Sequence, residues 1–129
     1  SVINDSKSTS YSSSIEMLKK SNNIYWLLGG IPKKGDKFRI SRKYYKNIKS
    51  FVFGKNYQKF SKDLKNKVKF KKFPNLKKAL YCVLRDIKKD NSNKKTILFS
   101  PAAASFDSFK NFEDRGFYFD KLIKKYLNV

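Results

Sequence analysis

Histidine is absent from this 129-residue sequence, and cysteine occurs once, as Cys82. One cysteine cannot form an internal disulfide or a thiol-pair redox centre. Without histidine, the chain can build neither a His-containing catalytic triad nor a His/Cys zinc site, and no metal site is expected within it. Cys82 falls in a stretch where apolar residues have helical spacing, so we expect it to be a small packing residue.

Acidic residues are scarce, with 10 Asp and Glu against 31 Lys and Arg, which gives a formal net charge of +21. A chain with this charge attracts anionic ligands and polyanions. The lysines are spread along the whole sequence, which is typical of a solvated surface. A basic nucleic-acid-binding module stays open as an alternative. It would bind DNA or RNA with a steep salt dependence, but no RRM, KH or zinc-finger signature is present.

Long apolar runs are also missing, since none approaches the roughly 20 residues of a membrane-spanning helix, and no membrane partner is expected. The first residues do not resemble a signal peptide, and the sequence does not begin with Met. We therefore expect a single domain, residues 1–129, cut from a longer protein. A hydrophobic content of 40% is sufficient for one core at this length.

Short apolar runs, most of them closed by glycine or by Ser-Pro, predict β-strands. Continuous runs of this length are typical of strands that are buried on both faces of a parallel sheet. The predicted strands are residues 24–28, 50–53, 67–70 and 96–99, with a truncated strand at residues 2–3.

Between these runs, apolar residues recur at helical spacing. They predict helices over residues 57–64, 76–87 and 119–127, and Ser12–Ser14 are expected to cap a short helix that contains residues 15–18. The alternation of strands and helices predicts an α/β domain. Its sheet should be doubly wound and mostly parallel, with helices on both faces.

Ligands of doubly wound sheets bind beyond the carboxyl ends of the strands. The first such segment contains Asp5 and Lys7 ahead of a helix. Free N–H groups at a helix N-terminus, together with Lys7, favour an anion, and Asp5 can accept a hydrogen bond from a ligand hydroxyl. The alternative is an ordinary serine-rich capping loop. All candidate segments are residues 4–10, 29–38, 54–56 and 100–112.

The second candidate segment begins with two glycines, Gly29 and Gly30. Glycines at this point allow a tight turn or a close approach to a ligand. The segment matches neither G-x-x-x-x-G-K-[ST] nor G-x-G-x-x-G, so a free-standing nucleotide-binding protein is the least favoured hypothesis. Lys33 lies at the expected mouth of the sheet, where it can pair with a carboxylate or belong to a simple surface turn.

Residues 100–112 are the most unusual part of the sequence. A proline and three alanines follow a predicted strand and permit the backbone to approach a ligand or a neighbouring domain closely. Ser105 can donate a hydroxyl hydrogen, and Phe106 can donate its backbone N–H. Phe109 and Phe112 are three residues apart, a spacing that is equally typical of a helix packed on a core.

Three segments carry recognisable motifs: residues 4–9 (NDSKST), 27–33 (LLGGIPK) and 100–116 (SPAAASFDSFKNFEDRG). They resemble, in the same order, the patterns N-D-S-K-A-T, L-x-G-G-x-x-K and S-P-A-x-A-S-x-D-x-F-x-x-[FY]-x-x-R-G. These patterns occur in the last domain of UDP-N-acetylmuramoyl-L-alanine:D-glutamate ligases. The resemblance covers essentially the whole chain, and the third motif is the most specific.

The resemblance implies a Rossmann-like domain of a cytoplasmic bacterial enzyme of peptidoglycan precursor synthesis. In this family ATP phosphorylates a carboxylate of UDP-N-acetylmuramoyl-L-alanine, and D-glutamate attacks the acyl phosphate to form an amide. A UDP-sugar-binding domain and a central domain that holds ATP and Mg²⁺ are expected outside this chain. The isolated domain is then expected to be inactive. Its expected partners are D-glutamate, the UDP-linked substrate, ATP and the central domain, with no specific nucleic acid.

The same resemblance implies roles for individual residues. Asp5 corresponds to an aspartate that contacts the nucleotide ribose. Lys7 corresponds to a catalytic lysine near the reacting phosphate, where positive charge stabilises the acyl phosphate and its transition state. The expected contacts to D-glutamate are Thr9, Lys33, Ser105 and the backbone of Phe106 and Phe112.

Overall fold

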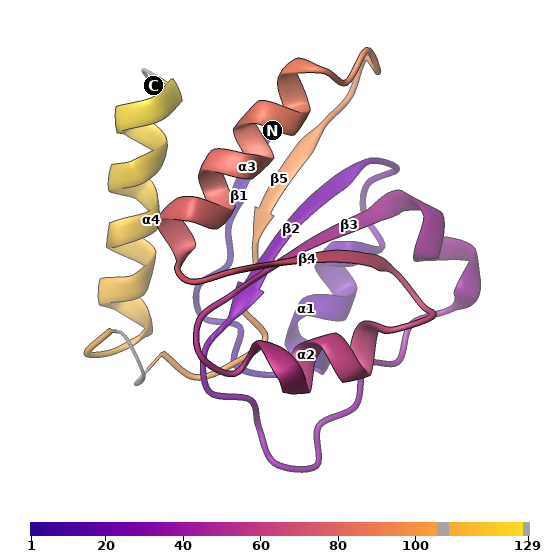
Figure 1. Ribbon diagram of the computed structural model, residues 1–129, viewed down its shortest axis with the longest axis vertical. Helices are drawn as coiled ribbons and strands as arrows, with labels where there is room; N and C mark the ends of the chain where they lie inside the picture. Colours follow the sequence, from indigo (N-terminus) through magenta and orange to yellow (C-terminus); the bar gives the residue numbers. More distant parts are fainter. Residues whose placement is uncertain (106–108, 128–129) are drawn as a thin grey trace.

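The computed structural model describes residues 1–105 and 109–127, and at its centre all five strands of one sheet run parallel (Figure 1). The strand order is β1-β5-β2-β3-β4, and helices cover both faces. The expected Rossmann-like α/β fold is therefore confirmed. The elements are β1 (Val2–Asn4), α1 (Tyr11–Leu18), β2 (Ile24–Gly29), the 3₁₀ helix η1 (Arg42–Asn47), β3 (Ile48–Phe53), α2 (Tyr57–Leu64), β4 (Lys69–Phe73), α3 (Leu76–Lys88), β5 (Thr96–Phe99) and α4 (Phe112–Leu127).

Two hydrophobic layers hold the helices on the sheet, and β2 contributes side chains to both because successive residues of a strand point to opposite faces. Trp26 and Leu28 join the layer that contains α1 and α2, whereas Tyr25 and Leu27 join the layer that contains α3 and α4. Each large side chain buried in this way contributes on the order of 2 kcal/mol. Cys82 is buried in the second layer, where it serves as a packing residue.

Helix α1 begins earlier than predicted. Ser10, rather than one of Ser12–Ser14, is the N-cap residue, and its hydroxyl accepts a hydrogen bond from a backbone N–H in the first turn. Ser14 lies inside the helix and is fully buried. Its hydroxyl is paired with those of Ser8 and Ser100, each at 2.6 Å. These tertiary hydrogen bonds outweigh the preference of serine for helix caps.

Strand β4 and helix α4 also differ from their predicted bounds. β4 lies at the edge of the sheet and ends at Phe73 rather than at residue 70. Its end was mispredicted because exposed lysines, which are common in edge strands, interrupt the apolar pattern. Helix α4 begins at Phe112 rather than at residue 119, because the side chain of Asn111 caps its first turn by accepting from the N–H of Asp114 at 2.8 Å. None of the helices in the described ranges is long and apolar enough to cross a membrane.

The carboxyl ends of all five strands meet at one edge of the sheet, because the strands are parallel. We call this edge the rim. Since β5 lies between β1 and β2, the loops that follow these three strands are neighbours. The described rim loops are residues 5–10, 30–41, 54–56, 74–75 and 100–105.

Candidate functional site

Three neighbouring rim loops carry the side chains that were predicted to bind D-glutamate. Thr9 follows β1, Lys33 follows β2 and Ser105 follows β5. The strand order places these loops next to one another in one half of the rim. The three loops therefore lie side by side, as a shared site would require.

A buried arginine of α4 joins the loops after β1 and β5. Arg115 is 1% exposed. Its Nη2 donates to the carbonyl of Ser6 at 2.6 Å, its Nη1 to the carbonyl of Ala103 at 2.8 Å, and its Nε to the hydroxyl of Ser6 at 3.2 Å. A buried guanidinium is costly unless its N–H groups are hydrogen-bonded, and carbonyls of both loops supply acceptors. Arg115 thereby fixes the two loops relative to each other.

The predicted nucleotide residue, Asp5, is part of a buried polar network. Asp5 is 7% exposed, and its Oδ2 accepts a hydrogen bond from the Ser100 hydroxyl at 2.7 Å. The carbonyl of Ser100 in turn accepts from the indole N–H of Trp26 at 2.7 Å. One carboxylate oxygen of Asp5 is therefore engaged in holding β1 and β5 together at the rim.

Gly29 and Gly30 allow the loops to approach one another. A Cβ on Gly29 would lie 2.1 Å from the carbonyl oxygen of Phe53, and a Cβ on Gly30 would lie 2.4 Å from that of Ala104. No side chain fits at these distances, and both φ angles, 155° and 128°, favour glycine. Beyond the glycines, Ile31 and Ala104 exchange two backbone hydrogen bonds at 2.9 Å. The loops after β2 and β5 are therefore attached to each other.

The predicted ligand-binding side chains differ in accessibility. Lys7, Thr9 and Lys33 are exposed. Ser105 is only 3% exposed, so its side chain lies largely below the surface of the rim. Among the predicted ligand-binding side chains, two cations and one hydroxyl are therefore directly exposed to solvent on the part of the rim beyond β1, β5 and β2, which we call the open half.

The remaining predicted contacts lie at the start of α4. Phe112 is 43% exposed, and as the first helical residue its N–H has no acceptor within the helix. Its carbonyl accepts from the hydroxyl of Ser6 at 2.7 Å, which ties this helix end to the loop after β1. Phe106 lies outside the described residues.

The rim presents positive charge to solvent. Asp5 and Asp36, carboxylates of the described rim, each accept a hydrogen bond from within the protein. A surface of this sign favours an anionic ligand such as a dicarboxylate. The exposed lysines of the described rim are Lys7, Lys33, Lys34, Lys37 and Lys55.

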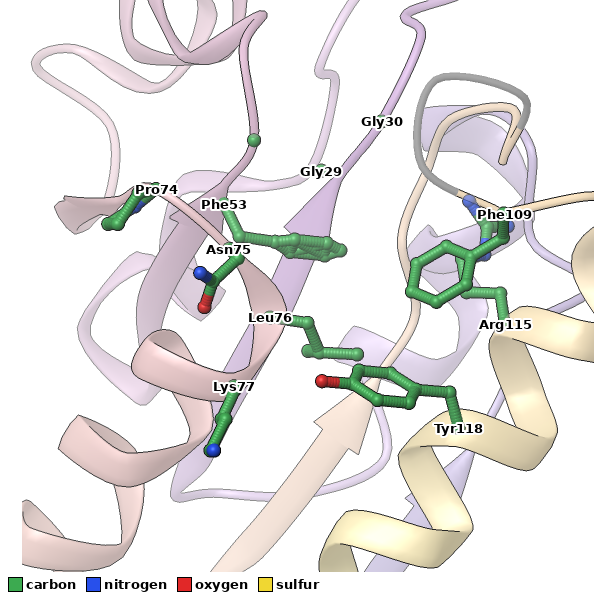
Figure 2. Close-up of a pocket in the computed structure, with 11 residues that line it drawn as sticks. Gly29, Gly30, Phe53, Pro74, Asn75, Leu76, Lys77, Phe109, Arg115 and Tyr118 are labelled. Atoms are coloured by element: carbon green, nitrogen blue, oxygen red, sulfur yellow. The ribbon is translucent and has the colours of Figure 1, made fainter.

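The rim also has a cavity of about 320 Å³ between α3 and α4 (Figure 2). Phe53 and Leu76 lie on one side of it, and Phe109 and Tyr118 lie on the other. The cavity also reaches the two glycines at the end of β2. None of the side chains that were predicted to bind a ligand is among its described lining residues.

The part of this cavity that follows β4 was not predicted from the sequence. Because β4 was predicted to end at residue 70, the segment that contains Asn75 and Lys77 was not recognised as part of the rim. The usable signal was Pro74 followed by Asn75, which is the N-cap of α3 and accepts from the backbone N–H of Lys78 at 2.9 Å.

No protein-family profile matches the chain, but individual curated proteins do. The chain is 42% identical over 123 residues to a UDP-N-acetylmuramoylalanine–D-glutamate ligase of Rickettsia felis, and the alignment covers 95% of the chain and 27% of that protein. It is 39% identical over 126 residues to the Rickettsia prowazekii protein of the same name, covering 98% of the chain and 28% of the relative. The chain therefore spans about a quarter of the length of the curated relatives it matches.

Proposed function

The chain belongs to the family of UDP-N-acetylmuramoylalanine–D-glutamate ligases, and we propose that it is the C-terminal domain that accepts the amino acid in such an enzyme. The whole protein then joins D-glutamate to UDP-N-acetylmuramoyl-L-alanine through an amide bond. The reaction belongs to peptidoglycan precursor synthesis and takes place in the cytoplasm, where ATP and the UDP-linked substrate are found.

In this proposal the open half of the rim grips D-glutamate by its two carboxylates. Lys33 and Thr9 provide a charge and a hydroxyl, and the other contacts come from Ser105 and from the backbone of Phe106 and Phe112. A lysine–carboxylate pair is worth little on an open surface and more in a cleft that excludes water. The exposed side chains therefore need a second surface to close over them, a role that the proposal gives to the central domain.

Lys7 and Asp5 act on the nucleotide side of the proposed site. Lys7 supplies positive charge beside the reacting phosphate, which stabilises the acyl phosphate and the charge that develops as the amine attacks. Asp5 is directed to the ribose. Because Oδ2 of Asp5 already accepts the Ser100 hydroxyl, a ribose hydroxyl is expected to bind the other carboxylate oxygen.

ATP and Mg²⁺ are assigned mainly to the central domain. In residues 1–105 and 109–127, no group of three or more acidic, Cys or His side chains is placed to hold a metal ion. The sequence also lacks a phosphate-binding loop motif, which fits a central domain that holds the phosphates and Mg²⁺. The contribution of the chain itself is to orient the amine donor and to exclude water when the domains close.

The observation that supports this proposal most strongly is the convergence of three motif-bearing loops at a cationic rim. Arg115 bonds the first loop to the third, and backbone hydrogen bonds of Ile31 attach the second to the third. The cations and N–H groups of this surface come from separate loops that are held at a fixed spacing. Such a surface can bind the two carboxylates of one small ligand at the same time.

Amide formation by the full-length protein tests the proposal. With ATP, Mg²⁺ and UDP-N-acetylmuramoyl-L-alanine present, we expect D-glutamate to be required and about one phosphate to be released per amide formed. The isolated 129-residue chain is expected to form no amide. A full-length protein that does not use D-glutamate, or an isolated chain that makes the product alone, would refute the assignment.

A further inference from the structure

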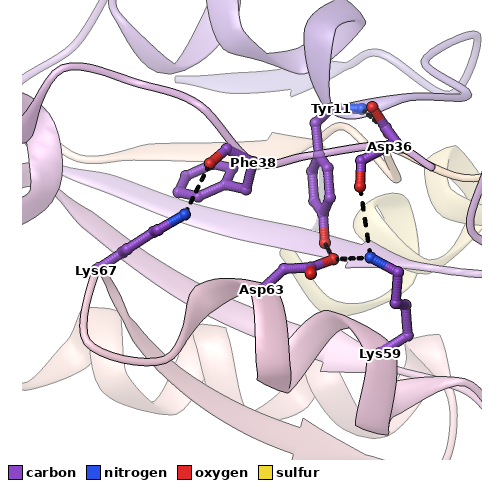
Figure 3. Close-up of polar contacts among 6 residues, drawn as sticks. All are labelled: Tyr11, Asp36, Phe38, Lys59, Asp63 and Lys67. Carbon is purple, nitrogen blue, oxygen red and sulfur yellow. Dashed lines mark hydrogen bonds and ion pairs between the residues drawn. The ribbon is translucent and has the colours of Figure 1, made fainter.

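The long loop that carries Lys33 has no α-helix or strand of its own, yet it is attached to α1 by a carboxylate. In this loop, residues 30–41, Oδ2 of Asp36 accepts a hydrogen bond from the backbone N–H of Tyr11 at 2.7 Å (Figure 3). Tyr11 is the first residue of α1, so its N–H has no acceptor within the helix. A negative charge at this end of a helix is also favoured by the helix dipole. The bond connects the Lys33 loop to the segment that carries Thr9.

The connection between the two ligand-binding candidates is short. The N–H of Asp36 donates to the carbonyl of Lys33 at 3.1 Å and closes a tight turn. Gly35 lies within this turn with a φ of 77°, a conformation that favours glycine. Thr9 is two residues before Tyr11 in the chain. One turn, one hydrogen bond and two residues of backbone therefore separate Lys33 from Thr9.

A second set of contacts supports the same junction from α2. The hydroxyl of Tyr11 donates to Oδ2 of Asp63 at 2.7 Å, and Nζ of Lys59 pairs with the same oxygen at 2.5 Å and donates to the carbonyl of Asp36 at 3.4 Å (Figure 3). Burial and the hydrogen bond to Asp63 raise the pKa of Tyr11, so its hydroxyl remains a donor at neutral pH. The four residues form a closed ring of contacts.

The loop has a further anchor on the other side of Asp36. Phe38 is 2% exposed and stacks on Trp26 with ring centroids 5.6 Å apart. Its carbonyl accepts from Nζ of Lys67 at 3.0 Å. With Phe38 in place, loss of the Asp36 carboxylate is expected to release the Lys33 turn without unfolding the loop.

We infer that Asp36 is a positioning residue for the amino-acid substrate, because its carboxylate sets the separation between Thr9 and Lys33. The inference rests on the proposed function, since both concern the same site. Asp36 itself need not touch the ligand. A dicarboxylate presents its charges at a limited range of spacings, so a displacement of about 1 Å in one partner weakens its binding.

Steady-state kinetics of the full-length enzyme test the inference. Asp36→Ala removes the acceptor, and we expect the KM for D-glutamate to rise about tenfold while the KM values for ATP and the UDP-linked substrate stay within about twofold. Asp36→Asn keeps an amide oxygen that can accept from Tyr11, so it should restore the D-glutamate KM to within about threefold. The matched control is Asp86→Ala, which removes a carboxylate of α3 that pairs with Lys71 of β4.

A double-mutant cycle separates this inference from the function on which it rests. If Asp36 acts through the position of Lys33, adding Asp36→Ala to Lys33→Ala should raise the D-glutamate KM by less than about twofold further. An unchanged D-glutamate KM and kcat in Lys33→Ala would count against the proposed function itself. The positioning role is overturned, with the function intact, if Lys33→Ala impairs D-glutamate use but Asp36→Ala does not. It is also overturned if the two effects multiply, or if Asp36→Asn is as impaired as Asp36→Ala.

Discussion

Two parts of the rim differ in how far they are enclosed and in the side chains that they present. The half beyond β1, β5 and β2 is open and cationic, and its loops are fixed by hydrogen bonds from Arg115 and to Asp36. The other part is a cavity of about 320 Å³ between α3 and α4, lined by residues from the ends of β2 and β3, from the segment after β4 and from α4, with Phe53 and Tyr118 in its walls. The family motifs concentrate their polar side chains on the open half. When a substrate binds between two domains, each domain alone leaves its binding residues exposed to solvent. The enclosed cavity therefore need not be the substrate site.

The largest effect is expected from Arg115, which lines the cavity and also bonds the loops of the open half. Arg115→Ala leaves buried carbonyls of Ser6 and Ala103 without this donor, so we expect the free energy of unfolding to fall by about 3 kcal/mol or more. Urea unfolding of the chain, followed by circular dichroism, measures the change. Lys124→Ala, an exposed lysine of the same helix, is the control and should stay within about 0.5 kcal/mol. A loss below about 1 kcal/mol in Arg115→Ala would show that the loops hold without it.

Substituting one lysine from the open half and one from the cavity shows which of the two binds D-glutamate. In the full-length enzyme, Lys33→Ala is expected to raise the KM for D-glutamate at least about tenfold with little change in the KM for ATP, because it removes a carboxylate partner. Lys77→Ala removes a cation from the cavity wall and should leave both KM values within about twofold. Steady-state kinetics with each substrate varied decide the matter. A larger D-glutamate effect from Lys77 than from Lys33 would move the site into the cavity.

The smallest effect is expected from Tyr11, which supports the open half from within the core. Burial and Asp63 raise the pKa of Tyr11 above its ordinary value of 10.0. The unfolded chain therefore releases this proton at a lower pH than the folded protein does. The resulting stabilisation is complete below about pH 10 and is lost as the pH rises further.

Tyr11→Phe removes this titration. Above about pH 10 the free energy of unfolding of the unsubstituted protein should fall more steeply than that of the variant, by up to about 1.4 kcal/mol per pH unit. Urea unfolding between about pH 9 and about pH 11 measures the two slopes. Tyr81→Phe, which removes the hydroxyl of a 61% exposed side chain, is the control and should follow the unsubstituted protein. Parallel slopes for Tyr11→Phe and the unsubstituted protein would contradict the raised pKa.

The fold was predictable where burial dominates the sequence pattern. Strands β2 and β5 and the second half of β3, residues 51–53, are mainly apolar because both of their faces are covered, whereas the start of β3 at Ile48, two residues before its predicted start, is hidden by Lys49 and Ser50. Edge strand β4 was predicted to start two residues and to end three residues too early, since its exposed lysines carry no periodic signal. Helix α1 was misjudged because the burial of Ser14 depends on Ser8 and Ser100, residues that only the folded chain brings to it.

The motifs of the candidate site could be predicted from the sequence, but the residues that hold its loops in place could not. Arg115 lies in the charged stretch Glu-Asp-Arg-Gly, a pattern that predicts solvent exposure. Its burial depends on carbonyls that come together only in the folded chain. Asp36 likewise reads as a loop carboxylate, since its partner Tyr11 lies 25 residues away in sequence. Residues that position a site depend on long-range geometry, whereas residues that contact a ligand are marked by their chemistry and spacing.

A crystal structure of the full-length enzyme with bound D-glutamate would show which part of the rim holds the substrate. We expect the amino acid to lie on the open half of the rim, with its carboxylates bound by Lys33 and Thr9 and covered by the neighbouring domain. D-glutamate enclosed in the cavity between Phe53 and Tyr118, with Lys33 left in solvent, would contradict this expectation.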